Sequence, residues 1–109
     1  MQPMQEGGDG MKVYISGPMS GIKDWNYPMF FATAELLRRL GFDVINPAEG
    51  VSEFDKPWNW YMRRALRLMM DADTILMLPG WSRSRGARLE RMVAKKLGMR
   101  VVERLEDLD

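Results

Sequence analysis

The chain has 109 residues, 46% of them hydrophobic and 28% charged, and its formal net charge is +1. This composition predicts one soluble globular domain, and the near-neutral charge gives no reason to expect direct binding to nucleic acid or a membrane. The sequence has no Cys and no His, which excludes disulfides, His-dependent catalytic triads and the usual zinc sites. Any catalysis would therefore depend on carboxylates, hydroxyls, Lys, Arg or a cofactor.

The first ten residues are polar and Gly-rich, and they lack the apolar segment of a secretory signal. We expect residues 1–10 to form a disordered leader and residues 11–109 to form the single domain. No apolar run approaches the roughly 20 residues that a membrane-spanning helix needs. A cytoplasmic location is therefore the expectation.

Short apolar runs alternate with longer amphipathic segments along the chain. In chain order the sequence predicts a strand at 12–16, a helix at 26–40, a strand at 42–46, a helix at 55–70, a strand at 73–78, a helix at 84–97 and a strand at 100–103. Helices of this length between short strands imply parallel pairing through right-handed crossovers. The predicted fold is a small doubly wound α/β sheet of four to five parallel strands, of the flavodoxin or Rossmann type, with helices on both faces.

The first two predicted helices each carry an apolar stripe at helical spacing, which should pack against the sheet. In the first helix, which ends at Gly41, the stripe consists of Phe30, Ala34, Leu37 and Leu40. In the second helix it consists of Trp58, Met62, Ala65, Leu66 and Met69.

Sheets of this type bind ligands outside the carboxyl ends of their strands. That rule selects the loops at 17–25, 47–56 and 79–84, and whatever follows Glu103. The first loop suits a phosphate or a sugar by position, although it matches neither the Walker A pattern nor GxGxxG. Tyr14 lies in the strand that leads into this loop, where its phenol reaches either the crevice or a half-buried core.

Glu90 is the leading candidate for a catalytic group. It shares one face of the third helix with Val93, Ala94 and Leu97, which should pack on the sheet. Glu90 should therefore point inward beside the strand ends. A partly buried carboxylate at such a crevice suits a nucleophile or a general base.

The surroundings of Glu90 allow two interpretations. Gly86 and Ala87, one turn earlier on the same face, are small and leave a concave space for a ligand. The alternative is a structural salt bridge, since ion pairs also place carboxylates in this way, with one of Arg38, Arg88 or Arg91 as the partner.

Basic and aromatic residues near the same loops extend the candidate site. The start of the third helix suits a phosphate or carboxylate ligand, or is a solvated basic turn, through Arg83, Ser84, Arg85 and Arg88. Aromatic side chains gather near the same edge, where a nucleobase would stack on them: Trp25, Tyr27, Trp58, Trp60 and Trp81. The alternative is a hydrophobic subunit interface or core, and Trp58 is better interpreted as core.

Four segments carry a resemblance to a known family: YISGPMSG at 14–21, NP at 46–47, ADTILMLPGW at 72–81, and S-x-G-x-x-x-E formed by Ser84, Gly86 and Glu90. Together they resemble the nucleoside 2-deoxyribosyltransferase-like superfamily, and more closely a domain family of phages and prophages within it. The resemblance covers nearly all of residues 11–103. It implies the same α/β fold and a substrate pocket that includes Gly17, Pro18, Ser20, Gly21, Asn46, Trp81, Ser84, Arg85 and Gly86.

The resemblance also implies an activity. Glu90 would attack the anomeric carbon of a deoxynucleoside or its 5′-monophosphate through an oxocarbenium-like transition state, much as retaining glycosidases do. Water or a second base would then take the sugar. Tyr14 would orient Glu90, and Ser84 would bind the sugar or the phosphate. The resemblance implies no metal and no cofactor, and it implies a homodimer or a larger homo-oligomer.

One departure from the superfamily concerns a second carboxylate. Relatives that cleave nucleosides carry a catalytic Asp in the helix before the third strand, where this chain has Arg63, Arg64 and Ala65. Arg63 or Arg64 would instead bind a phosphate and favour a nucleotide. Two further hypotheses therefore stay open: a non-catalytic module that binds or sequesters a nucleotide, and a phage-derived module that binds a host protein through the Trp-rich edge.

Overall fold

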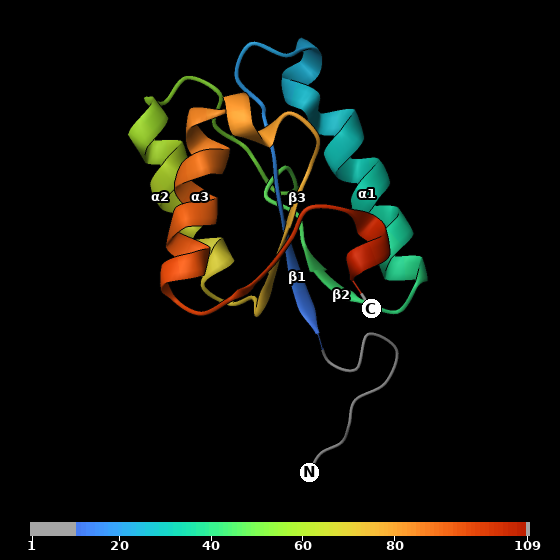
Figure 1. Ribbon diagram of the computed structural model, residues 1–109. Coiled ribbons are helices and arrows are strands. Elements are labelled where there is room, and N and C mark those ends of the chain that lie inside the picture. Colours follow the sequence, from blue (N-terminus) through green and yellow to red (C-terminus); the bar gives the residue numbers. More distant parts are fainter. Residues whose placement is uncertain (1–10, 109) are drawn as a thin grey trace.

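The computed structural model describes residues 11–108, so the predicted leader at 1–10 lies outside the described residues. Four parallel strands form one sheet: β1 (Lys12–Ser16), β2 (Asp43–Ile45), β3 (Thr74–Met77) and β4 (Arg100–Val102). Their order across the sheet is β2-β1-β3-β4 (Figure 1). Because the chain moves from β1 to one neighbour and then crosses to the other, the strand order reverses between β1 and β3. Ligands bind at such a reversal, outside the carboxyl ends of the two strands.

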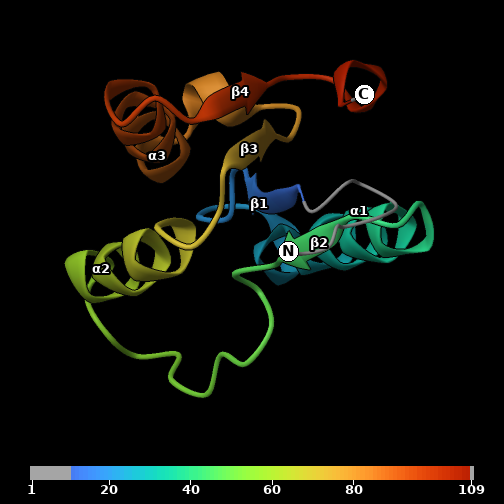
Figure 2. The ribbon, with the colours of Figure 1, turned by 90° about the horizontal axis from the view of Figure 1, so that it is seen from below.

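Three helices cover the two faces of the sheet: α1 (Tyr27–Arg39), α2 (Trp58–Met69) and α3 (Arg85–Lys96). Figure 2 shows α1 on one side of the sheet and both α2 and α3 on the other. Short 3-10 turns occur at Lys23–Asn26, Trp81–Arg83 and Leu105–Asp107. This arrangement confirms the predicted doubly wound, Rossmann-like α/β fold, with four strands. Within residues 11–108, no helix is long and apolar enough to cross a membrane.

The central strand β1 supplies both faces of the sheet with buried side chains, because successive residues of a strand point to opposite sides. Val13 and Ile15 belong to the apolar cluster under α1. Tyr14 belongs to the cluster under α2 and α3, where Ser16 also reaches a side chain of α3. Polar side chains of β1 are thus confined to the face that α3 covers.

In α1 and α3, the predicted inward face departs from the structure at its last position, whereas the last stripe position of α2, Met69, is buried. Phe30, Ala34 and Leu37 are buried, but Leu40 is 60% exposed. Leu97, predicted to pack on the sheet at the end of the third helix, is 59% exposed. Both predictions were wrong for the same reason. Each residue is the C-cap of its helix and stands directly before a glycine with positive φ, where the chain leaves the helical path.

Candidate functional site

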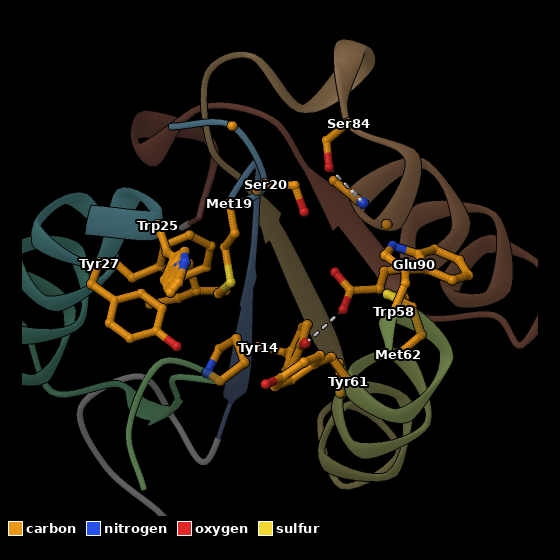
Figure 3. Close-up of a pocket in the computed structure, with 18 of the residues that line it drawn as sticks. Tyr14, Met19, Ser20, Trp25, Tyr27, Trp58, Tyr61, Met62, Ser84 and Glu90 are labelled. Atoms are coloured by element: carbon orange, nitrogen blue, oxygen red, sulfur yellow. Dashed lines mark hydrogen bonds between the residues drawn. The ribbon is translucent and has the colours of Figure 1, made fainter. Parts of the chain in front are cut away.

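A cavity of about 370 Å³ opens at the carboxyl end of β1, between the loops that follow β1 and β2 and the helices α2 and α3 (Figure 3). This volume is within the range of small-molecule sites, about 300–1,000 Å³. Ser20 and Ser84 lie at one end of the cavity in the view of Figure 3, and Tyr61 lies at the other end. Glu90 projects from α3 into the space between them.

Glu90 is held by two hydroxyl groups from β1. The Tyr14 hydroxyl donates to Glu90 Oε2 at 2.8 Å, and the Ser16 hydroxyl donates to Glu90 Oε1 at 2.5 Å. The three residues are 6% exposed or less. Tyr14 and Ser16 reach the same carboxylate because they are two positions apart on one strand and therefore share a face. The carboxylate is thus fixed in orientation before any ligand arrives.

No basic side chain within residues 11–108 forms a salt bridge with Glu90, so the structural salt-bridge alternative was wrong. Arg38 instead pairs with Glu49 at 2.6 Å, and Arg91 pairs with Glu103 at 2.8 Å. Burial raises the pKa of Glu90 to about 7, although the hydrogen bonds from Ser16 and Tyr14 act in the opposite direction. Burial, with the nearby Glu90 charge, also raises the pKa of Tyr14. Near neutral pH a substantial fraction of Glu90 is therefore ionised.

Two aromatic walls flank the carboxylate. One wall contains Trp25, Tyr27 and Phe54, with Trp25 and Phe54 stacked at 5.8 Å between ring centroids and 13° between ring planes. The other wall comes from α2, which contributes Trp58 and Tyr61. Figure 3 shows Trp25 and Tyr27 facing Trp58 across the cavity. Flat apolar walls of this kind suit a stacked ring system.

The wall that contains Trp25 rests on an unusual backbone. Asp24, Trp25 and Asn26 have φ values of 54°, 55° and 60°, the left-handed region that costs a non-glycine residue roughly 1–2 kcal/mol. The Asn26 side-chain amide supports the segment by donating to the Pro18 carbonyl at 3.0 Å. Backbone strain of this kind concentrates at functional sites. Here it sets the position of a pocket-lining indole.

Two glycines allow the elements around the cavity to approach closely. A Cβ atom on Gly86 of α3 would lie 3.0 Å from Met62 Sδ of α2, and one on Gly17 would lie 2.8 Å from Leu78 Cβ. Both glycines line the cavity. Gly86 therefore has two roles: it leaves the predicted open space in front of Glu90, and it allows α3 to pack closely against α2.

The structure brings together some of the predicted substrate-binding residues and separates the others. The cavity is lined by Gly17, Ser20, Gly21, Ser84 and Gly86, together with the two predicted catalytic residues, Tyr14 and Glu90. Four predicted residues do not line it: Pro18, Asn46, Trp81 and Arg85. Ser84 also caps α3, since its hydroxyl accepts a hydrogen bond from the Ala87 backbone N–H at 3.1 Å.

The four residues outside the lining have structural contacts, and that of Pro18 is its carbonyl, which accepts a hydrogen bond from the Asn26 side chain. Asn46 is buried and organises the loop after β2, because its side-chain oxygen accepts from the Ala48 N–H at 3.0 Å. The Trp81 ring is covered by the Arg91 guanidinium at 4.6 Å. The Arg85 guanidinium lies 3.6 Å from the centroid of the Trp58 ring, so it contacts the back of a wall residue.

The two arginines proposed for a phosphate lie elsewhere. Arg64 donates to the backbone carbonyls of Pro47 and Glu49 at 2.9 Å and 2.8 Å, which ties α2 to the loop after β2. Arg63 is exposed and does not line the cavity. In the part of the chain that the structure describes, the basic residue that does line the cavity is Lys56, in the loop after β2.

Sequence reasoning missed several residues of the candidate site. Ser16 was detectable, because it shares a strand face with Tyr14. Trp58 was assigned to the core, although it forms a wall of the cavity. Phe54 and Lys56 lie in the loop at 47–56 that the strand-end rule selected, but nothing singled them out within it, since a loop has no periodicity. Tyr61 carried no signal, because one helical residue does not show which neighbour it faces. Within residues 11–108, no group of three or more His, Cys, Asp or Glu side chains could hold a metal ion.

Residues 11–103 match a protein family described as a domain of unknown function, DUF4406. The match covers most of the chain, and the chain belongs to this family. It includes all four strands and every residue that lines the cavity. No curated protein matches the chain.

Proposed function

We propose that this member of the DUF4406 family cleaves or transfers the N-glycosidic bond of a deoxynucleoside 5′-monophosphate or a related nucleotide, with Glu90 as the nucleophile. One observation carries the proposal: a buried carboxylate, with no cationic partner among residues 11–108, is held by two hydroxyls at the centre of an aromatic-walled cavity. The sequence resemblance to nucleoside 2-deoxyribosyltransferases supports it.

Burying Glu90 without a cation lowers the stability of the fold, so stability does not explain its position. A functional role does, because active-site groups are commonly retained at a cost in stability. A nucleophilic carboxylate needs an oxygen that faces the reacting carbon and little competing water. The hydroxyls of Tyr14 and Ser16 fix the direction of the carboxylate, and the surrounding apolar walls limit water. In this proposal the sugar lies over Glu90, the base lies between the aromatic walls, and the phosphate lies beside Ser20 and Ser84 at the start of α3.

The proposed reaction has two steps. A Glu90 oxygen forms a bond to C1′ while the C1′–N bond breaks, its electron pair stays with the base, and the base takes a proton from solvent. The product is a glycosyl ester of Glu90. Water or a second base then attacks C1′, loses a proton to solvent and restores the carboxylate. Retaining glycosidases follow the same logic.

A second function also has an observation in its favour. Among the cavity-lining residues within 11–108, Glu90 is the one carboxylate, whereas glycosidases use a pair. A cavity with one carboxylate also suits a module that binds a nucleotide without cleaving it. Such a module would be stabilised thermally by its ligand and would release no base.

The test is an incubation with nucleosides and nucleoside 5′-monophosphates in which free base is measured by chromatography. We expect base release by the native protein and a loss of at least about a thousandfold in Glu90→Ala. Glu35→Ala, an exposed change on α1, is the matched control and should retain activity. Ligand-induced thermal stabilisation with no base release would reject catalysis and leave the binding module.

A further inference from the structure

We infer that the base of the bound nucleotide carries a carbonyl group at its outer edge, and that Lys56 recognises this group. The inference rests on the proposed function, because it takes the ligand to be a nucleotide with its sugar over Glu90. It adds a specificity-determining residue and a class of base. Uracil, thymine and the 6-oxopurines have such a carbonyl, whereas cytosine and adenine have an amino group at the same place.

The cavity-lining side chains that hydrogen-bond in one direction only are mostly donors, whereas the Ser and Tyr hydroxyls can donate or accept. Lys56 can only donate, and so can the indole N–H groups of Trp25 and Trp58. No Asn, Gln or Asp lines the cavity within residues 11–108, and Glu90 is already held by two hydroxyls. The one-directional groups therefore favour a ligand rich in acceptors, such as a phosphate or a carbonyl, over one rich in amino groups.

The position of Lys56 assigns it to the base and not to the phosphate. Its backbone N–H donates to the Tyr61 hydroxyl at 3.2 Å, which fixes this part of the loop beside Tyr61. Tyr61 and the hydroxyls of Ser20 and Ser84 lie at opposite ends of the cavity, with Glu90 between them (Figure 3). If the phosphate lies at the serine end and the sugar over Glu90, the base extends toward Lys56.

The ammonium group of Lys56 remains able to bind a ligand. Its ion pair with Glu53 is long, at 3.9 Å, and both side chains are more than 40% exposed, so the pair is weak. Phe54, which stacks on Trp25 in one aromatic wall of the cavity, lies two residues before Lys56 in the chain. A base stacked there presents its edge to the ammonium group, which donates to a carbonyl and repels an amino group.

Two matched ligand pairs test the inference. dUMP and dCMP differ at position 4 of the base, and dIMP and dAMP differ at position 6, in each case a carbonyl against an amino group. Binding is measured by calorimetry on Glu90→Gln, which prevents turnover, and base release is measured on the native protein. We expect the carbonyl member of at least one pair to bind about tenfold more tightly, and Lys56→Met to abolish the difference. Lys95→Met, which removes an equal charge outside the cavity, should leave it intact.

The outcomes separate this inference from the proposed function. Base release without any preference for the carbonyl member, or a preference that persists in Lys56→Met, overturns the role of Lys56 and leaves the glycosidic activity standing. Equal weakening of all four nucleotides by Lys56→Met assigns the lysine to the phosphate and also overturns the inference. Selective binding without base release overturns the glycosidic activity and leaves the inference standing for a binding module. Absence of binding by all four nucleotides overturns both.

Discussion

The two faces of the sheet differ in how their buried side chains are used. On the face covered by α1, the strands β1 and β3 contribute Val13, Ile15 and Leu76 to the apolar cluster that packs around α1. On the face covered by α2 and α3, the same central strand contributes Tyr14 and Ser16, which hold a buried carboxylate. The first face serves packing alone, and the second combines packing with a polar site.

This difference shows how a small domain can separate stability from chemistry. Alternation along β1 delivers apolar and polar side chains to opposite sides within five residues. The α1 face can therefore be tightly packed and stabilise the fold. The α3 face holds a buried carboxylate that is hydrogen-bonded but has no neutralising cation among residues 11–108, which lowers the free energy of unfolding. Truncating a core side chain on the α1 face and removing the Glu90 charge on the α3 face should then have effects of opposite sign on stability.

The largest effect on stability should come from the α1 face. Leu76 is 2% exposed, and Leu76→Ala should lower the free energy of unfolding by about 2–5 kcal/mol through lost burial and the cavity left behind. Urea unfolding followed by circular dichroism measures the loss. Leu40→Ala is the matched control, because Leu40 is 60% exposed and its truncation should cost less than about 0.5 kcal/mol. Equal losses at the two positions would contradict the assignment of the core.

Glu90→Gln should act in the opposite direction on the α3 face. The folded-state pKa of Glu90 is raised to about 7 from an ordinary value of 4.5, mainly by burial. The native protein therefore binds a proton more tightly than the unfolded chain does, and its stability falls as the pH rises from about 4.5 through about 7. Glu90→Gln has no carboxyl group to ionise, so its free energy of unfolding should not fall in this way. Relative to the native protein, the variant should become more stable as the pH rises through that window, by on the order of 3 kcal/mol at pH 8.

Urea unfolding at pH 5, 6, 7 and 8 measures this gain, with Glu35→Gln on the exposed surface of α1 as the matched control. A stability difference between Glu90→Gln and the native protein that does not change with pH would show that Glu90 does not titrate in this range. That result would contradict the proposed difference between the α1 face, which only stabilises the fold, and the α3 face, which holds a buried carboxylate at a cost in stability.

The smallest expected effect concerns the hydrogen bonds to Glu90. Of the two hydroxyls that lower its pKa, Ser16 acts more strongly than Tyr14. Ser16→Ala should therefore raise the pKa of Glu90 further, by about one pH unit, and Tyr14→Phe should raise it less. Carbon-13 NMR of labelled glutamate measures the pKa directly. If base release requires ionised Glu90, its half-maximal pH should move upward by the same amount. An unchanged pKa in Ser16→Ala would contradict a holding role for Ser16.

Much of the fold was predictable because its signals are local. The strands begin and end within one or two residues of the predicted limits, as Gly and Pro punctuate each apolar run. The helix stripes identified Phe30, Leu37 and Met69 as core. The predictions for Leu40 and Leu97 were wrong because helical periodicity does not show where a C-cap turns the chain away from the sheet.

The candidate site was predictable only in part. Spacing placed Glu90 inward, and the strand-end rule placed the loop with Gly17 and Ser20 beside it. The same rule also selected Trp81, whose ring is covered by Arg91 instead. A loop assignment gives the neighbourhood of a side chain but not its direction.

By itself the sequence determined the order of strands and helices, the parallel sheet that follows from that order, and the inward face on which Glu90 lies. These features depend on periodicity and turn residues a few positions apart. Only the tertiary structure decided what Glu90 meets. Its two hydroxyl partners lie 74 and 76 residues away in the chain. Lys56, which lines the same cavity, comes from the loop between β2 and α2. Such meetings depend on how separate segments pack in three dimensions, which no local pattern encodes.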